Sequence, residues 1–303
     1  MEQAFYHIPV LLGPSVDGLN VRKGGTYVDV TLGGGGHSRE ILNRLGSAGK
    51  LYSFDQDADA IVRCATPEAG CWTLVHSNFR YVKNWMRYYA VDAIDGLIAD
   101  LGVSSHHFDA GERGFSFRSD APLDMRMNRQ AGLTAADVVN TYSAPQLSSL
   151  FRLYGEIRQA SRLADAIVKA RQHQEVRTTG QLSALLTPLL GRDSTQKDLA
   201  RAFQALRIEV NHEMDALREM LVAATELLRP GGRLVVLSYH SLEDRIVKNM
   251  MRAGNIEGTT EQDIYGHTQA PLRPVGKAIV PDSEEQSMNP RSRSAKLRIA
   301  EKI

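Results

Sequence analysis

The stretch Thr26-Tyr-Val-Asp-Val-Thr-Leu-Gly-Gly-Gly-Gly-His-Ser38 decides the fold of this chain. Tyr27, Val28 and Val30 favour a β-strand, which the glycines end. Beyond the glycines, Ser38 can cap a helix whose apolar residues recur at helical spacing. Glycines lack Cβ, so the N–H groups of a turn and a helix N-terminus can approach a ligand closely. The stretch therefore predicts a strand, a ligand-binding loop and a helix. The alternative is a glycine-rich turn that merely connects the two elements.

A second predicted strand, residues 50–54, is followed by Asp55, twenty positions after Gly35. An acid at this place commonly holds the two hydroxyls of a nucleoside ribose. Dinucleotides and S-adenosylmethionine both contain such a ribose. A dinucleotide loop is expected as G-x-G-x-x-G/A, whereas His37 and Ser38 follow the glycines here. The loop therefore favours S-adenosylmethionine, and an oxidoreductase that uses a dinucleotide is the alternative.

The composition is that of an ordinary globular protein, with 303 residues, 43% hydrophobic and 23% charged. A net charge of +1 creates no global basic field, so any nucleic-acid contact must come from local patches. Cys64 and Cys71 lack the spacing of a metal site and predict free thiols in a reducing compartment. No apolar run is long enough to span a membrane, and no signal peptide is evident. We expect a cytoplasmic protein that binds neither metal nor membrane.

Strands and helices alternate after Asp55. A helix is expected over residues 57–65 and strands over 72–76 and 94–99. This alternation predicts a parallel sheet in a doubly wound α/β fold, whose ligands bind at the carboxyl ends of the strands. The groups expected at that edge are Asp29, Asp55, His76 to Phe79 and Asp100. Phe79 is compatible with two roles, as a ring beside an adenine or as core filler.

The regular alternation stops between Ser104 and about Ala205. A loop at residues 109–127 mixes arginines with phenylalanines, a combination that binds phosphate and stacks on bases. The same aromatic residues are equally suited to packing against the helices that follow. Helices are expected over residues 135–140, 146–154, 156–172 and 181–190. The region therefore predicts an inserted helical subdomain.

The core fold resumes with a long helix from about Leu199 to Pro230 and a strand at residues 233–238. Ser241 can cap the next helix, with Asp244 at its N3 position. Capping does not explain Tyr239 and His240, which directly precede Ser241. Two short strands, residues 277–280 and 295–299, suit an antiparallel closing hairpin. The basic run between them, residues 289–298, is suited to contact a polyanion.

Seven motifs, in order along the chain, resemble those of the bacterial ribosomal RNA small subunit methyltransferase H family. They are Gly33-Gly-Gly-Gly-His-Ser38, Asp100-Leu-Gly-Val-Ser-Ser105, Arg113-Gly-Phe-Ser-Phe117, Pro122-Leu-Asp-Met-Arg-Met127, Phe203-Gln-Ala-Leu-Arg-Ile208, Ser238-Tyr-His-Ser-Leu-Glu-Asp-Arg245 and Asn289-Pro-Arg-Ser-Arg-Ser-Ala-Lys-Leu-Arg298. The resemblance implies an α/β, Rossmann-like, S-adenosylmethionine-dependent methyltransferase sheet with an inserted helical subdomain. We expect the core at residues 1–105 and 206–303 and the insert at 106–205. The implied reaction is methylation of the exocyclic N4 of one cytidine in the decoding region of 16S ribosomal RNA.

The resemblance also implies the roles of individual residues. Cofactor contacts are expected at Gly35, Gly36, His37, Asp55, Phe79, Asp100 and His107. Substrate contacts are expected at Arg113, Phe115, Arg126, Tyr239, Arg291 and Arg293. Among these residues, His107 stands where relatives commonly have Gln, and Tyr239 where they commonly have Phe. Outside them, Leu199-Ala-Arg201 and Met127-Asn128 replace the usual Ala-Thr-Arg and Met-Asp.

Many amino-methyltransferases hold the base with an Asp/Asn/Ser-Pro-Pro-aromatic tetrapeptide after strand four. This chain has Asp100-Leu-Gly-Val103 there, without the prolines or the aromatic residue. We therefore expect the strand-five cluster to hold the base, with His240 and Ser241 as catalytic residues. The expected partner is 16S ribosomal RNA within the small ribosomal subunit, and a homodimer is left open. The competing functions are a DNA amino-methyltransferase and a non-enzymatic RNA-binding module.

Overall fold

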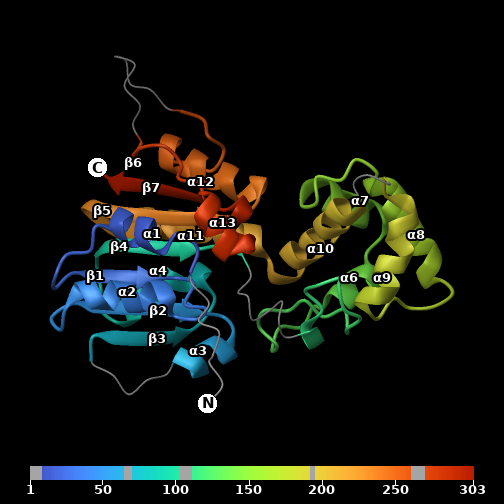
Figure 1. The fold of residues 1–303 in the computed structure, drawn as a ribbon, viewed down its shortest axis with the longest axis horizontal. Helices are drawn as coiled ribbons and strands as arrows, with labels where there is room; N and C mark the ends of the chain where they lie inside the picture. The colour runs from blue at the N-terminus through green and yellow to red at the C-terminus, as the bar shows by residue number, and fades with distance from the viewer. Residues whose placement is uncertain (1–8, 65–69, 103–110, 192–194, 261–269) are drawn as a thin grey trace. The chain divides into compact units, whose positions relative to one another are not determined.

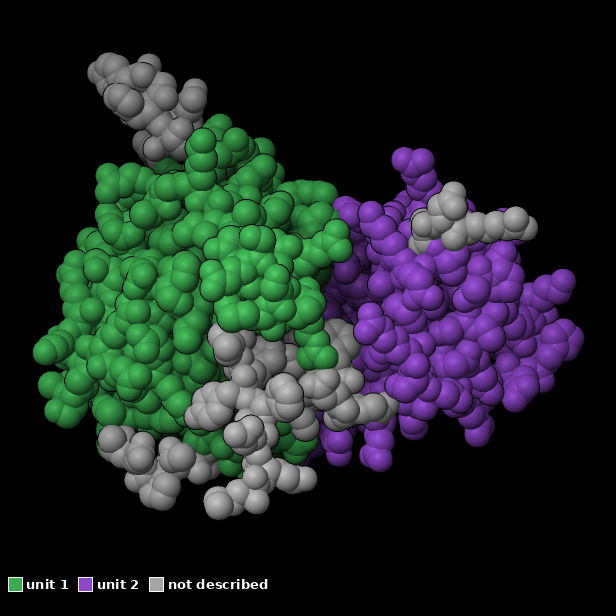
Figure 2. Space-filling view, in the orientation of Figure 1, with its two compact units in different colours: residues 1–102, 214–303 green, residues 103–213 purple. Residues whose placement is uncertain are grey.

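The structure is a computed structural model that describes residues 9–64, 70–102, 111–191, 195–260 and 270–303. The chain divides into two compact units, residues 1–102 with 214–303 and residues 103–213 (Figure 2). The second unit ends eight residues later than the insert expected at 106–205. The reason is α10 (Thr195–Asn211), a continuous helix whose apolar side packs into the core of that unit.

The first unit is built on a seven-stranded sheet in the order β3-β2-β1-β4-β5-β7-β6 (Figure 1). Strands β1 to β5 pair in parallel with one another, whereas β7 runs antiparallel to both β5 and β6. The strands are β1 (Thr26–Asp29), β2 (Lys50–Asp55), β3 (Trp72–His76), β4 (Ile94–Asp100), β5 (Leu228–Ser238), β6 (Leu272–Pro274) and β7 (Lys296–Lys302). The strand order reverses between β1 and β4, which is where doubly wound sheets bind ligands. The predicted parallel α/β sheet is confirmed.

Alternate strand residues point to opposite sides of this sheet, and apolar residues on both sides are covered by helices. Tyr27 packs with α1 (Leu12–Leu19) and α2 (Gly36–Leu45) in one apolar core. Its neighbour Val28 packs in a second core, on the other face. The helices of that second core are α4 (Val82–Tyr88), α11 (Glu213–Leu227) and α12 (Ser241–Ala253). Short helices α3 (Ala58–Cys64) and α13 (Ser283–Met288) complete the described part of the unit.

The second unit is helical and has an apolar core of its own. Besides α10 it contains α6 (Ala135–Thr141), α7 (Ala144–Leu153), α8 (Ala160–Arg171) and α9 (Thr179–Leu186). Thr134, Ser143 and Thr178 cap α6, α7 and α9 through reciprocal capping boxes. Helix α9 therefore begins one residue after Thr178 and ends before a 3-10 turn at Thr187–Leu189, because Pro188 cannot continue it.

Two expected elements differ from the structure. The single long helix expected from Leu199 to Pro230 is wrong, because His212 takes a left-handed φ of 50° and separates α10 from α11. The closing hairpin is present, but its first strand is β6, and residues 277–280 contribute a single bridge from Ile279 to Leu297. Both cysteines are free thiols, as expected. Of the helices in the described ranges, none combines the length and apolar character that a membrane crossing requires.

Candidate active site at the carboxyl ends of the parallel strands

The glycine loop needs glycine for two physical reasons. Gly33 and Gly35 have φ values of 50° and 78°, which side chains rarely adopt. A Cβ on Gly35 would lie 3.0 Å from Cys64 Sγ, and one on Gly36 would lie 2.1 Å from a carbon of Pro9. At Gly34, in contrast, no atom of a described residue lies within 4 Å of the Cβ position. The loop is thus packed closely beneath Gly35 and Gly36 and open at Gly34.

Helix α2 begins at Gly36 with Gly35 as its N-cap residue, so the expected capping role of Ser38 is wrong. Ser38 is fully buried, and its hydroxyl donates to Asp29 Oδ2 at 2.6 Å. Ser53 lies 2.8 Å from Ser38, and the indole N–H of Trp72 donates to Ser53 at 2.8 Å. Because each hydroxyl has one proton, Ser53 must donate to Ser38. The bonds therefore run in one direction, from Trp72 to the Asp29 carboxylate.

Asp29 also holds the neighbouring strand end. Its Oδ1 accepts the backbone N–H of Thr31 at 3.0 Å and lies 3.4 Å from the Thr31 hydroxyl. That hydroxyl accepts the backbone N–H of Asp100 at 2.7 Å. A buried network thus joins β3, β2, α2, β1 and the end of β4. Sequence reasoning missed it, although Ser53 in an otherwise apolar strand was a visible signal.

Asp55 lies directly against the glycine loop. Its Oδ2 accepts the backbone N–H of Gly33 at 2.9 Å, and its Oδ1 accepts that of Asp57 at 2.9 Å. A carboxylate held against the loop at the end of β2 is the kind of group that binds the two hydroxyls of a ribose. Phe79, in the 3-10 turn after β3, is half-buried at the edge of the core. That position is compatible with both roles expected for its ring.

Asp100 and Tyr239 connect the polar residues at the ends of β4 and β5, which are far apart in the sequence. The Tyr239 hydroxyl donates to Asp100 Oδ1 at 2.6 Å, and Asp100 Oδ2 lies 3.9 Å from His37 Nδ1. Burial raises the pKa of the Tyr239 phenol, and the Asp100 carboxylate raises it further, so the phenol remains a donor. His37 is 5% exposed, and its Nε2 has no hydrogen-bond partner within the described residues.

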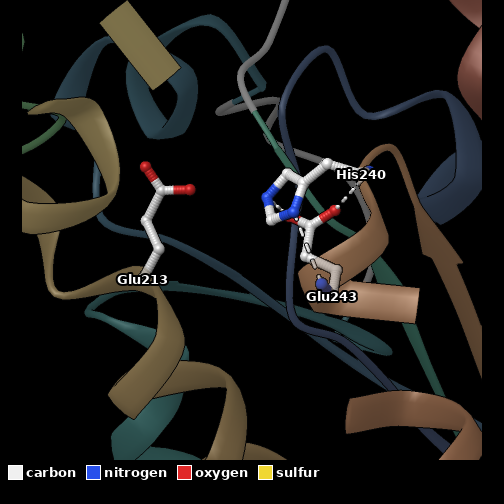
Figure 3. A group of neighbouring side chains, drawn as sticks. All are labelled: Glu213, His240 and Glu243. Atoms are coloured by element: carbon white, nitrogen blue, oxygen red, sulfur yellow. Dashed lines mark hydrogen bonds and ion pairs between the residues drawn. The ribbon is translucent and has the colours of Figure 1, made fainter. Parts of the chain in front are cut away.

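His240 and Glu243 lie at the start of α12 (Figure 3). Glu243 Oε2 accepts the backbone N–H of Tyr239 at 2.8 Å and that of His240 at 3.3 Å. His240 Nδ1 accepts the backbone N–H of Glu243 at 3.4 Å. His240 is therefore the N-cap residue and Glu243 is N3, so the capping predicted for Ser241 and Asp244 is wrong by one residue. Sequence reasoning missed Glu243, although it stands three residues after His240.

The Asp244 side chain takes no part in this cap and bonds to β7 instead. Asp244 accepts from Arg298 Nε at 2.7 Å and Lys296 Nζ at 3.2 Å, which ties α12 to β7. Burial would raise the pKa of Asp244, but these hydrogen bonds outweigh it and hold the pKa below its usual range. Ser241 is exposed at the first turn of α12.

The predicted substrate residues of the second unit are engaged with their own loop. Arg113 is 4% exposed and donates to the carbonyls of Arg126 and Met127 at 2.8 and 2.7 Å. Its guanidinium lies 5.6 Å from the ring centre of Phe115, which is buried. Arg126 pairs with Asp124 at 2.7 Å. These contacts favour the packing alternative, and substrate contact by the three residues stays a prediction.

The remaining predicted contact residues are Arg291, Arg293 and His107. Arg291 and Arg293 are exposed on a 3-10 turn, Pro290–Ser294, that leads into β7. Because β7 runs antiparallel to β5, this turn lies at the carboxyl end of β5, the same edge as Asp100. His107 lies outside the described residues.

Comparison with known proteins identifies the family of the chain. The family model described as the MraW methylase family matches residues 4–303. The chain is 60% identical over 302 residues to ribosomal RNA small subunit methyltransferase H of Bacteroides thetaiotaomicron, covering 99% of both chains. It is 53% identical over 298 residues to the protein of that name from Flavobacterium johnsoniae, covering 98% of both. The chain belongs to the MraW methylase family.

Proposed function

We propose that this chain transfers the methyl group of S-adenosylmethionine to the exocyclic N4 of one cytidine in the decoding region of 16S ribosomal RNA. The observation that carries the proposal is the sheet edge where Asp55 accepts from the glycine loop at Gly33 and a buried network ending at Thr31 holds the backbone of Asp100. The names of relatives at up to 60% identity support ribosomal RNA of the small subunit as the substrate class. The motif resemblance alone supports the cytidine N4 position.

The residues at this edge fit S-adenosylmethionine. The loop is open at Gly34, Asp55 offers a carboxylate for a ribose, and His37 offers a buried nitrogen that no described residue satisfies. Gly33, Gly35 and Gly36 bring the backbone close to such a ligand. Phe79 and Asp100 would complete the contacts. Bound there, the cofactor would supply an electrophilic methyl group.

The chain must make a poor nucleophile react, because the lone pair of a cytosine amino group is delocalised into the ring. Holding the amine in line with the methyl group lowers the entropic part of the barrier. A fixed acceptor for the amino hydrogens stabilises the charge that builds on nitrogen. Asp100 is such an acceptor, because network bonds hold its backbone and Tyr239 holds its side chain. The proton can leave after transfer, so no strong base is needed.

We propose that His240 and Ser241 orient the base beside Asp100. His240 is fixed as the cap of α12, and Ser241 follows it at the exposed start of the helix. We expect His240→Ala and Ser241→Ala each to lower turnover by at least tenfold, about 1.4 kcal/mol of activation free energy. Ser287→Ala, at an exposed serine of α13, is the matched control. Near-normal turnover in both variants would show that the assignment is wrong.

The target cytidine must be unstacked to reach the methyl group, which favours a structured RNA loop within the small subunit. Arg291 and Arg293 are exposed at the same sheet edge and suit phosphate contacts. A ribosomal substrate would place the reaction in the cytoplasm. The competing DNA amino-methyltransferase would act on naked duplex DNA instead.

The deciding experiment is methyl transfer from labelled S-adenosylmethionine to three substrates. These are purified small ribosomal subunits, naked 16S ribosomal RNA and duplex DNA, with the modified nucleoside identified by mass. N4-methylated cytidine on the ribosomal substrate is the expected product. Label on DNA, on another base, or on none of the three despite cofactor binding would overturn the proposal.

A further inference from the structure

Helix α4 and the 3-10 turn that leads into it contain the dipeptide Arg-Tyr twice, at residues 80–81 and 87–88. Residues 79–89 as a whole contain five aromatic and three basic residues and no acidic residue. We propose that the exposed side of this segment binds single-stranded RNA, with bases stacked on Tyr81 and Tyr88. The inference rests on the proposed function, because the RNA would be the part of the substrate that flanks the target cytidine.

Helical spacing places these side chains in two rows. Tyr81 and Tyr88 are seven residues apart, which is nearly two turns, so they lie on one side of the helix. Arg80 and Arg87 have the same spacing and form a second row beside the first. Asn84 is exposed and lies between the two rows. A strand of RNA along the helix would therefore meet rings on one side and guanidinium groups on the other.

The two rings are accessible, and neighbouring rings support the outer one. Tyr88 is 76% exposed and Tyr81 is 50% exposed. The ring centre of Tyr88 lies 5.6 Å from that of Trp85 and 5.1 Å from that of Tyr89, at interplanar angles of 82° and 77°. Tyr89 in turn lies 5.1 Å from Tyr52 of β2, which anchors the cluster to the sheet. A base would meet a ring whose motion is already restricted, which lowers the entropic cost of binding.

The charges beside the rings suit a phosphate backbone. Arg80 donates to Glu219 at 2.8 Å, and its guanidinium lies 5.8 Å from the ring centre of the tyrosine that follows it. Lys83 pairs with Glu226 at 2.5 Å. Arg87 is exposed, and within the described ranges no acidic residue pairs with it. The two ion pairs are neutral overall, so Arg87 remains available to a phosphate.

This combination of groups favours RNA over a protein partner. The centres of protein interfaces are depleted of charged residues, whereas here an arginine directly precedes each exposed ring. Every base has a π-face, so aromatic rings beside basic side chains bind single strands of any sequence. Tyr88 is about 10 Å along the helix from Tyr81, at 1.5 Å per residue, and so further from the predicted cofactor contact Phe79. The surface should therefore contribute affinity for the substrate and leave the chemical step unchanged.

The informative substitution is Tyr88→Leu, which removes the ring and keeps an apolar side chain. Tyr88→Phe, which keeps the ring, is its control. The first arm measures the Kd of oligoadenylate and oligouridylate by fluorescence anisotropy. We expect Tyr88→Leu to weaken binding of both about tenfold and Tyr88→Phe to stay within about twofold of the parent. The second arm measures methyl transfer to small ribosomal subunits, where Tyr88→Leu should raise KM about tenfold with kcat unchanged.

A charge-removing pair of variants tests the phosphate contact. Arg87→Gln should lower the slope of log K against log salt by about 0.7, the value for one phosphate of a single strand. The matched control is Arg252→Gln, at an exposed arginine of α12 that has no partner in the described part of the chain. This control should leave the slope unchanged. An unchanged slope in Arg87→Gln, or an equal change in both variants, would count against the contact.

The oligonucleotide arm decides on the surface by itself. Parent-like RNA binding by Tyr88→Leu, or an equal loss in Tyr88→Phe, would overturn the inference. If only the KM for whole subunits rises in Tyr88→Leu, the surface contacts a protein of the subunit, and the assignment to RNA is wrong. If the parent methylates no ribosomal RNA, the proposed function fails, and a tenfold loss of oligonucleotide binding in Tyr88→Leu would still support the surface.

Discussion

The buried hydroxyl pair beneath the glycine loop supports a quantitative prediction about stability. Ser38 and Ser53 are both fully buried and stand in a directed chain that ends on Asp29, which is 1% exposed. Ser38→Ala removes the donor to a carboxylate, which costs about 1.5–3 kcal/mol. It also leaves the Ser53 hydroxyl without an acceptor, which adds about 1 kcal/mol. We expect a total loss of about 2.5–4 kcal/mol.

Ser53→Ala should cost less, although it breaks as many bonds. Its two partners are the neutral groups of Ser38 and Trp72, and the bond from Ser38 to Asp29 survives. Neutral hydrogen bonds contribute about 1 kcal/mol each, so we expect a loss of about 2 kcal/mol. The ordering, with Ser38→Ala well above Ser53→Ala, follows from the direction of the chain. A chain running the other way would not predict it.

Urea denaturation followed by tryptophan fluorescence is a suitable assay. Both tryptophans of the chain, Trp72 and Trp85, lie in the first unit, so their emission reports the unfolding of the unit that carries the network. The control is Ser287→Ala, which removes an exposed hydroxyl of the same unit and should stay within about 0.5 kcal/mol of the parent. A loss for Ser38→Ala no greater than that of Ser53→Ala would refute the directed chain.

Three further predictions concern the loop, a buried ion pair and the basic turn. Gly35→Ala should lose stability and cofactor affinity. Gly46→Ala, with a similar φ of 73° but no described atom within 4 Å of its Cβ position, should lose stability alone, and calorimetry against S-adenosylhomocysteine separates the two. Asp244→Asn should destabilise the protein at neutral pH. Because the pKa of Asp244 is depressed in the folded state, the deficit should be complete above about pH 4 and shrink as the pH falls further, as urea midpoints at several pH values will show. Replacing Arg291 and Arg293 together by Gln should lower the slope of log K for RNA against log salt by about 1.5, and an unchanged slope would remove both from the interface.

Much of the fold was readable because it depends on local signals. The strand, glycine loop and helix around residues 26–45 follow from β-forming residues, glycines and helical periodicity. Polar residues directly after apolar runs correctly located Asp55 and Asp100 at the carboxyl edge of the sheet. The capping residue of a helix was harder to predict, because neighbouring polar residues can cap equally well. His240 caps α12 instead of Ser241, since Glu243 then accepts from two backbone N–H groups.

The sequence by itself determined a parallel α/β sheet, a glycine loop at a ligand-binding edge and a helical insert, because periodicity and glycine placement act over a few residues. Only the tertiary structure decided which polar groups meet. Tyr239 and Asp100 are 139 residues apart, and Ser38, Ser53 and Trp72 come from three different elements. Such pairs form when packing brings buried polar groups together and the cost of leaving them unpaired forces them to bond. No local sequence pattern encodes these pairings, so the hydrogen bonds that position Asp100 form only once the strands are assembled.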